Sequence, residues 1–160
     1  KSGVAQFPQN TNILYDYALA AENLGKYGIM EESLKRIIEI DPNYQQAYNA
    51  LGYSLADRNL RLDEAYILID KAIKLAPDDP YIIDSLGWVF FRQGDLDLAE
   101  QNLRHAYKLR SDNEIAIHLA EVLWTKGNRQ EALSLFSKVK KKDPDNDLLN
   151  STLTRLKIKL

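Results

Sequence analysis

The sequence predicts an all-α solenoid of consecutive helix–turn–helix units, because the same pattern of residues returns at a nearly constant interval. Gly94 recurs as Gly127 one interval later, and Ala65 recurs as Ala99. Prolines keep the same step, at positions 8, 42 and 77. A period of roughly 34 residues is typical of stacked repeats, each of which is too small to bury its apolar face alone.

Four copies of the repeat follow from this alignment, and each contains the pattern of two helices. We place the copies at residues 11–44, 45–79, 80–112 and 113–146. In the third copy, one apolar stripe at helical spacing is formed by Ile83, Leu86, Gly87 and Phe90. The small residue Gly87 marks a place where two helix backbones are expected to approach closely.

The ends of the predicted helices are marked by residues with strong terminal preferences. Asp79 is expected to cap the first helix of the third copy, with Pro80 at its first position. Gly94 is expected to end this helix, since glycine readily adopts the left-handed backbone conformation found after helices.

The two ends of the chain are expected to differ in role. Residues 1–10 are interpreted as the tail of a preceding repeat or as a linker, whereas residues 147–160 are expected to form a capping helix, with Leu149, Leu153 and Leu156 on one side. An uncapped first repeat is costly. We therefore expect the chain to be the carboxyl-terminal part of a longer solenoid, and a complete protein with an irregular start is the alternative.

Composition excludes several classes of function. The net charge is −2, which does not favour nucleic-acid binding, and the chain has no cysteine for disulfides or thiolate metal sites. No apolar run approaches the roughly 20 residues of a membrane helix, so we expect no direct insertion into a membrane. The one basic run, Lys138 with residues 140–142, is interpreted as a complement to the dipole at a helix end.

No catalytic pattern is found in the sequence. The two histidines, His105 and His118, fall on different predicted helices and lack the spacing of metal ligands. His118 is expected to be solvated or hydrogen-bonded. Serines occur without the motif of a nucleophile elbow. The sequence therefore predicts neither an enzyme nor a site for a metal or another cofactor.

A second face of the predicted helices carries more aromatic surface than the core requires. Trp88 and Phe91 lie about 120° around the helix from the apolar stripe, on the same side as Asp84 and Tyr81. Large aromatic side chains with few rotamers are good anchors for a partner protein. Two alternatives are that Trp88 and Phe91 pack on the first helix of the next repeat, or that they pack on a loop.

The recurring small residues, the alanines of the second helices and the proline near the end of each copy resemble the tetratricopeptide repeat (TPR) family over residues 11–146. The stretch LGKYGIMEESLKRIIEIDP, residues 24–42, is especially similar. The resemblance implies a right-handed superhelical solenoid whose first helices line a concave groove that usually binds partner peptides. The predicted partner-binding residues are Tyr15, Leu19, Asn49, Tyr53, Tyr81, Asp84, Trp88, Phe91, Arg92, Ile117, Glu121 and Trp124.

The charges expected along this groove indicate the chemistry of the partner. Carboxylates at Asp57, Asp84, Glu114 and Glu121, against Arg92, would repel the acidic chaperone tails that some TPR domains bind. The predicted partner is therefore a protein or peptide with an apolar, neutral-to-basic segment. Alternatively, the groove is filled by another part of the same chain or by a second copy, which would make the chain a structural or self-association module.

A finer resemblance covers residues 50–106 and the following stretch HLAEVLWTKGNRQEAL. Both are similar to the carboxyl-terminal region of large bacterial outer-membrane TPR lipoproteins, including a type that serves as the adaptor of a periplasmic protease. This resemblance implies a periplasmic adaptor tethered to the outer membrane through a missing amino-terminal region. Its partners would include a periplasmic protease or a cell-wall enzyme. A cytoplasmic location remains the alternative.

Overall fold

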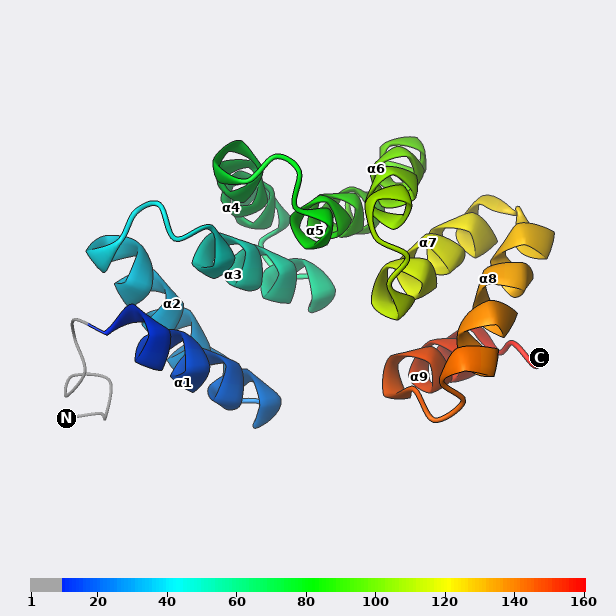
Figure 1. Cartoon of the computed structure of the whole chain (residues 1–160), viewed down its shortest axis with the longest axis horizontal. Coiled ribbons are helices and arrows are strands. Elements are labelled where there is room, and N and C mark those ends of the chain that lie inside the picture. Colours follow the sequence, from blue (N-terminus) through cyan, green and yellow to red (C-terminus); the bar gives the residue numbers. More distant parts are fainter. Residues whose placement is uncertain (1–9) are drawn as a thin grey trace. The chain divides into compact units, whose positions relative to one another are not determined.

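A computed structural model describes residues 10–160, and these residues form nine α-helices and no strand (Figure 1). The helices are α1 (Thr11–Asn23), α2 (Tyr27–Ile40), α3 (Gln45–Asp57), α4 (Leu62–Leu75), α5 (Pro80–Arg92), α6 (Leu96–Leu109), α7 (Asn113–Lys126), α8 (Arg129–Lys142) and α9 (Asp147–Leu156). The all-α prediction is confirmed. The first nine residues, for which the sequence predicts a preceding tail, lie outside the described part.

The helices pack as successive pairs, in which α1 packs on α2, α3 on α4, α5 on α6 and α7 on α8. Each predicted copy of the repeat contains one such pair. The described part of the chain divides into two compact units, residues 10–77 and residues 78–160. In the first unit α2 also packs on α3, and in the second unit α6 packs on α7 and α9 packs on both α7 and α8.

Capping residues fix several helix ends as the sequence predicts. The Asp79 side chain accepts hydrogen bonds from the backbone N–H groups of Tyr81 and Ile82, and Pro80 occupies the first turn of α5. Gly94, after α5, has a φ of +88°, a backbone conformation that suits glycine. None of the helices among residues 10–160 is both long and apolar enough to cross a membrane.

Each unit has its own apolar core between the paired helices. The fully buried side chains of the first unit include Leu14, Leu34, Ile37, Leu51 and Ile69. In the second unit the buried cluster includes Leu103, Leu119, Phe136, Val139 and Leu149. In the predicted stripe of the third copy, Ile83 and Gly87 are buried, while Leu86 and Phe90 are half-buried. The helices are held together mainly by burial of apolar side chains.

The glycine at position 87 is required by the close packing of α5 on α6. A Cβ atom at Gly87 would lie 2.7 Å from Leu103 Cγ and 3.2 Å from the carbonyl oxygen of Ala99. We expect Gly87→Ala to lower the free energy of unfolding by about 1–3 kcal/mol, because the second unit must shift to accommodate the methyl group. Urea unfolding followed by circular dichroism measures the change.

Gly28 supplies the control for this substitution. It lies in α2, and a Cβ atom there would have no neighbour within 4 Å. Gly28→Ala should therefore leave stability unchanged or raise it by up to ~1 kcal/mol, through the higher helix propensity of alanine. Equal effects of the two substitutions would show that close helix approach does not explain Gly87.

Candidate protein-interaction surface

Trp88 is buried in the second unit. Its side chain is 3% exposed, and its indole ring stacks on the His118 imidazole of α7 with ring centroids 4.2 Å apart. It also stacks on Phe91 of its own helix, at 4.8 Å. The interpretation that Trp88 is an accessible groove residue is wrong. The alternative, that it packs on the first helix of the next repeat, is confirmed.

A buried contact between a histidine and a carboxylate accompanies this stack. The His118 Nδ1 atom lies 2.9 Å from Asp84 Oδ1 and 3.1 Å from Asp84 Oδ2, and both side chains are almost fully buried. The expectation of a hydrogen-bonded His118 is therefore confirmed. Asp84 is on α5 and His118 on α7, so the pair joins the first helices of two successive repeats.

A second pair repeats this arrangement one repeat further along. The Arg155 guanidinium of α9 makes two hydrogen bonds to the Glu121 carboxylate of α7, at 2.8 and 2.7 Å. The Glu121 side chain is only 4% exposed. Glu121 and Arg155 are separated along the chain by the same interval as Asp84 and His118. Both pairs therefore connect positions one repeat apart and serve cohesion between repeats.

Four predicted partner-binding residues offer almost no accessible surface. They are Asp84, Trp88, Ile117 and Glu121, each 3% exposed or less. A helical wheel places them beside the groove because it gives only the angle from the stripe within one repeat. In the solenoid this side packs against a helix of the following repeat or the capping helix, as Asp84 does on α7 and Glu121 on α9. The prediction that these residues are exposed is therefore wrong.

The remaining predicted residues of the second unit are more accessible. Tyr81 is exposed, while Phe91, Arg92 and Trp124 are half-buried. The Tyr81 hydroxyl donates to Asp112 Oδ2 and accepts from Arg110 Nε. The Arg129 guanidinium lies 4.2 Å from the centroid of the Trp124 ring. These contacts hold the side chains in fixed positions, and a binding role for them stays a prediction.

In the first unit, α1 makes two side-chain contacts, one with Tyr44, the residue before α3, and one with α3 itself. At one end Tyr44, which directly precedes α3, contacts the Tyr15 ring at 5.8 Å between centroids, and its hydroxyl donates to Asn12. At the other end the Glu22 carboxyl is hydrogen-bonded to Ser54. The first helices of these two repeats therefore lie beside each other.

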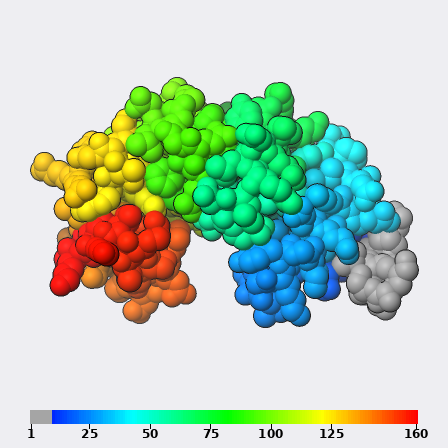
Figure 2. Space-filling view, turned by 180° about the vertical axis from the view of Figure 1, so that it is seen from behind, coloured from blue at the N-terminus to red at the C-terminus, as the bar shows by residue number. Residues whose placement is uncertain are grey.

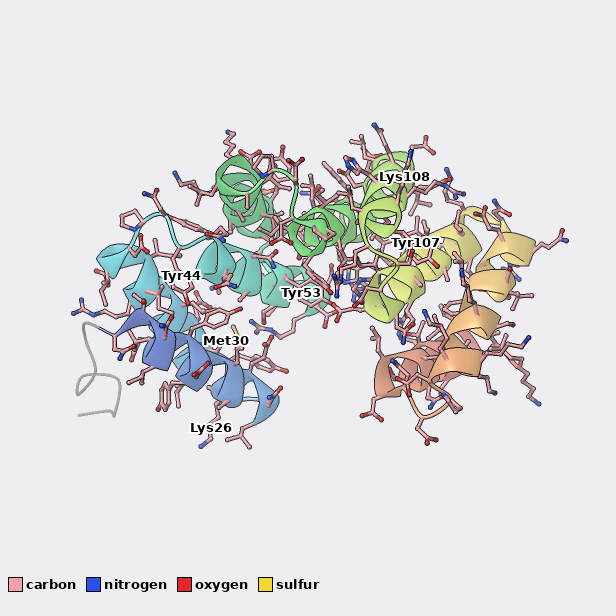
Figure 3. The ribbon with its side chains drawn as sticks, in the orientation of Figure 1. Lys26, Met30, Tyr44, Tyr53, Tyr107 and Lys108 are labelled. Carbon is pink, nitrogen blue, oxygen red and sulfur yellow. The ribbon has the colours of Figure 1, made fainter. Side chains whose placement is uncertain are left out.

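Four predicted partner-binding residues lie along the same two helices, and we call them the α1–α3 face: Tyr15, Leu19, Asn49 and Tyr53. All four are half-buried. Figure 3 labels Tyr44 and Tyr53, which stand near the two ends of α3. Spacings of four residues, from Tyr15 to Leu19 and from Asn49 to Tyr53, place each pair on one side of its helix.

Asn49 has an unusual environment on this face. Its side-chain oxygen Oδ1 is buried, yet it has no hydrogen-bond partner among the described residues. A buried acceptor without a donor costs about 1–3 kcal/mol. Replacing the amide by an apolar group of similar size should therefore cost the fold little.

Burial also raises the pKa values of two side chains on or beside the α1–α3 face. Desolvation raises the pKa of Glu22, while the hydrogen bond from Ser54 and the nearby Arg58 charge oppose the shift. Desolvation raises the pKa of Tyr15 as well, so its phenol stays neutral at physiological pH. The face therefore presents aromatic, aliphatic and amide groups bordered by acidic side chains, and none of its four residues is a cation.

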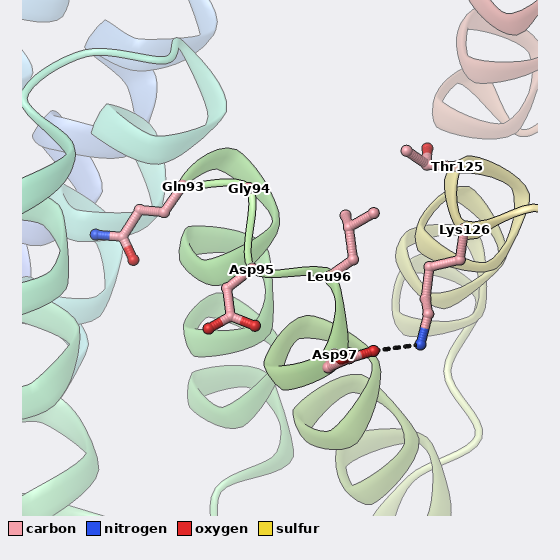
Figure 4. Close-up of a pocket in the computed structure, with 7 residues that line it drawn as sticks. All are labelled: Gln93, Gly94, Asp95, Leu96, Asp97, Thr125 and Lys126. Carbon is pink, nitrogen blue, oxygen red and sulfur yellow. Dashed lines mark hydrogen bonds and ion pairs between the residues drawn. The ribbon is translucent and has the colours of Figure 1, made fainter.

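Outside this face, the second unit has an open polar pocket of about 640 Å³, lined by Gln93, Gly94, Asp95, Leu96, Asp97, Thr125 and Lys126 (Figure 4). Its charged groups already have partners. Lys126 Nζ lies 2.7 Å from Asp97 Oδ1 and 2.7 Å from Glu100 Oε1, and these contacts raise the pKa of Lys126. The Asp95 side chain accepts from the backbone N–H of Leu98. The pocket is thus part of the ionic network that joins α6 and α7.

The structure brings together three side chains of metal-ligand type from two repeats. Ligand atoms of Asp84, Glu114 and His118 lie within 4.8 Å of one another. Sequence spacing alone does not reveal this cluster, because Asp84 comes from a different repeat. Asp84 and His118 are engaged with each other, and Glu114 is exposed, so the geometry alone assigns no metal to the cluster. His105 is exposed on α6.

Known proteins resemble the chain over most of its length. A relative from Pseudomonas aeruginosa, the TPR repeat-containing protein PA4667, is 46% identical over 121 residues, which are 76% of this chain and 20% of that relative. The chain therefore spans a fifth of the length of this relative. The structure of TTC0263, a thermophilic TPR protein in Thermus thermophilus, has a TM-score of 0.82 and 25% identity, and covers 97% of this chain and 86% of that one.

A further structure shares the fold at lower identity. YrrB, described as a TPR protein with an unusual peptide-binding site, has a TM-score of 0.65 and 19% identity, over 96% of this chain and 81% of that one. Family models described as tetratricopeptide repeat match residues 11–44 in the first unit and residues 90–156 in the second. With these matches in both units and a fold of repeated helix pairs, the chain belongs to the tetratricopeptide repeat family.

Proposed function

We propose that this chain is a protein-interaction module that holds a segment of a partner protein against the α1–α3 face. TPR proteins generally mediate protein–protein interactions, and their fold is typically a non-catalytic scaffold. The observation that carries the proposal is that Tyr15, Leu19, Asn49 and Tyr53 keep accessible surface on the first helices of the first unit, unlike Trp88 in the second. The aromatic rings supply apolar contact area, and the half-buried Asn49 side chain supplies a polar contact to the backbone of the bound segment.

The preferred segment is apolar and neutral to basic. Glu22 and the exposed Asp57 border the face, and they favour a cation over an acidic tail. YrrB offers a precedent for peptide binding in the same fold, although its identity of 19% carries only the fold.

The proposed setting is the bacterial cell envelope, where the chain would act as an adaptor. This part of the proposal rests on the resemblance of residues 50–106 to outer-membrane TPR lipoproteins. The 46% identity to a bacterial relative supports a bacterial setting. A periplasmic protease or a cell-wall enzyme is the proposed client class, so an envelope extract is the appropriate source of partners.

The variant Asn49→Leu separates binding from folding. It removes the unpartnered acceptor and keeps similar volume, so stability should stay equal or rise, while capture of the partner falls about fivefold to tenfold. The experiment immobilises the chain, applies bacterial envelope extract and quantifies captured proteins by mass spectrometry. Circular dichroism and thermal unfolding of the same samples report stability.

Tyr17 supplies the matched control. It lies on α1 two residues from Tyr15, and its side chain is 38% exposed. Tyr17→Ala should leave capture unchanged, whereas Tyr15→Ala should reduce it. If Asn49→Leu captured the partner as well as the unchanged chain does, the α1–α3 face would not be the binding surface.

A second function, cohesion of the solenoid, is supported for the aromatic residues of the second unit. Trp88 contacts His118 of the next repeat, and its burial leaves little surface for a partner. These residues stabilise the scaffold on which the α1–α3 face is carried.

A further inference from the structure

Positive charge gathers at the carboxyl-terminal end of the second unit. Residues 137–160 contain seven basic and three acidic residues, whereas the chain before them contains 14 basic and 20 acidic residues. The chain as a whole carries −2, so this end has the opposite sign to the rest. Figure 2 shows α9 and the residues after it, in red, at the surface beside the orange residues of α8 and its following loop.

Six lysines lie at this end of the chain. They are Lys138, Lys140, Lys141, Lys142, Lys157 and Lys159, and all are exposed. Arg61, Arg104 and Lys126 each pair with two carboxylates. Across residues 10–160, by contrast, none of the six lysines takes part in an ion pair. Their charges remain available to an external anion.

The helix dipole explains only part of this cluster. Lys140, Lys141 and Lys142 lie in the last turn of α8, where cations are favoured. Lys157 and Lys159 follow the end of α9 and belong to another segment of the chain. The dipole effect is confined to the last turn of its own helix, so it gives no reason for these additional charges.

An apolar cleft lies beside two of these lysines, Lys140 and Lys141. Its volume is about 370 Å³, and it is lined by Ser137, Lys140, Lys141, Pro144 and Leu160. The Leu160 side chain is 45% exposed. Two lysines beside an apolar floor fit a ligand that carries carboxylates next to an apolar side chain.

The shape of the cluster favours a protein segment over a membrane surface. On a helix, Lys140 and Lys142 point about 160° apart, so the lysines surround α8 and do not lie in one plane. A lipid surface would meet only some of them. A flexible acidic segment can follow this curved surface while its apolar side chain enters the cleft.

We propose that the cleft between the end of α8 and Leu160, with Lys140 and Lys141 beside it, is a second docking site that binds an acidic protein segment containing an apolar residue. The α1–α3 face prefers the opposite charge, so the chain can hold two different segments. This site shares no residue with the α1–α3 face, so an experiment that rejects one proposal does not affect the other.

Fluorescence anisotropy of the whole chain tests the proposal with a defined probe. The probe is a fluorescein-labelled peptide in which glutamates flank a leucine–phenylalanine pair, and its counterpart carries lysines in place of the glutamates. We expect binding of the acidic peptide alone, weakened by added salt because the charges are exposed. Lys140→Gln with Lys141→Gln should weaken it at least about tenfold.

Two further variants keep the result interpretable. The control pair Lys71→Gln with Lys108→Gln removes two exposed lysines from α4 and α6 and should leave binding unchanged. Leu160→Asp tests the apolar floor and should also weaken binding. Binding of both peptides, equal loss in the control pair, or no binding at all would overturn the proposal. Lysine-dependent binding to phosphatidylglycerol vesicles without binding to the acidic peptide would replace it with a membrane contact.

Discussion

Replacing Trp88 with alanine is expected to lower the free energy of unfolding by roughly 3–5 kcal/mol, the usual cost of removing a buried aromatic side chain. Trp88 is 3% exposed and stacks on both His118 and Phe91, so truncation leaves a cavity and removes two ring contacts. Urea unfolding followed by circular dichroism in the far ultraviolet measures the loss, since this signal reports mainly on the helical backbone.

The other tryptophan is the natural comparison. Trp124 is half-buried and lies under the Arg129 guanidinium. Trp124→Ala should cost less than Trp88→Ala, because less of its surface leaves contact with the core. A Trp88→Ala variant as stable as the unchanged chain would show that Trp88 faces solvent and would make it a candidate partner anchor again.

Asp84→Ala is expected to have the second large effect, a loss of about 3–5 kcal/mol. The substitution leaves the His118 ring buried without the carboxylate that lies 2.9 Å from its Nδ1 atom. Asp84→Asn should cost less, since the amide oxygen can still accept a hydrogen bond from Nδ1–H. Thermal and urea unfolding of the two variants provide the comparison.

The double variant Asp84→Leu with His118→Leu isolates the penalty of the broken pair. When both partners become apolar, no buried polar group is left alone, and stability should recover in part relative to Asp84→Ala. If Asp84→Ala were neutral, the pair between α5 and α7 would have no structural role.

The helices and their pairing could be predicted because their causes are local and periodic. Asp79, Pro80 and Gly94 mark the ends of α5 through backbone preferences that need no tertiary information. The regular interval between copies then shows that neighbouring units are equivalent and must stack. Gly87 occupies the small-residue position of this pattern, and the packing of Leu103 against it gives the reason.

The accessible surface could not be predicted in the same way. A helical wheel gives the direction of Trp88 relative to its own stripe, but the neighbour that covers it comes from the next repeat. One signal was present in the sequence, since Asp84 and His118, and likewise Glu121 and Arg155, are complementary pairs one repeat apart. In a solenoid, such pairs on first helices are candidates for direct contact. The unpartnered Asn49 oxygen has no such signal, because it depends on side-chain packing.

The measurement that tests the proposed binding surface most directly is site-specific photocrosslinking. A benzoylphenylalanine placed at position 15 or 53 would lie on the α1–α3 face, and one at position 17 would lie on the exposed side of the same α1 helix. The chain is irradiated in envelope extract, and crosslinked products are identified by mass spectrometry. We predict one shared partner at positions 15 and 53 and none at position 17. Crosslinking at position 17 alone, with a partner captured by the chain, would contradict it.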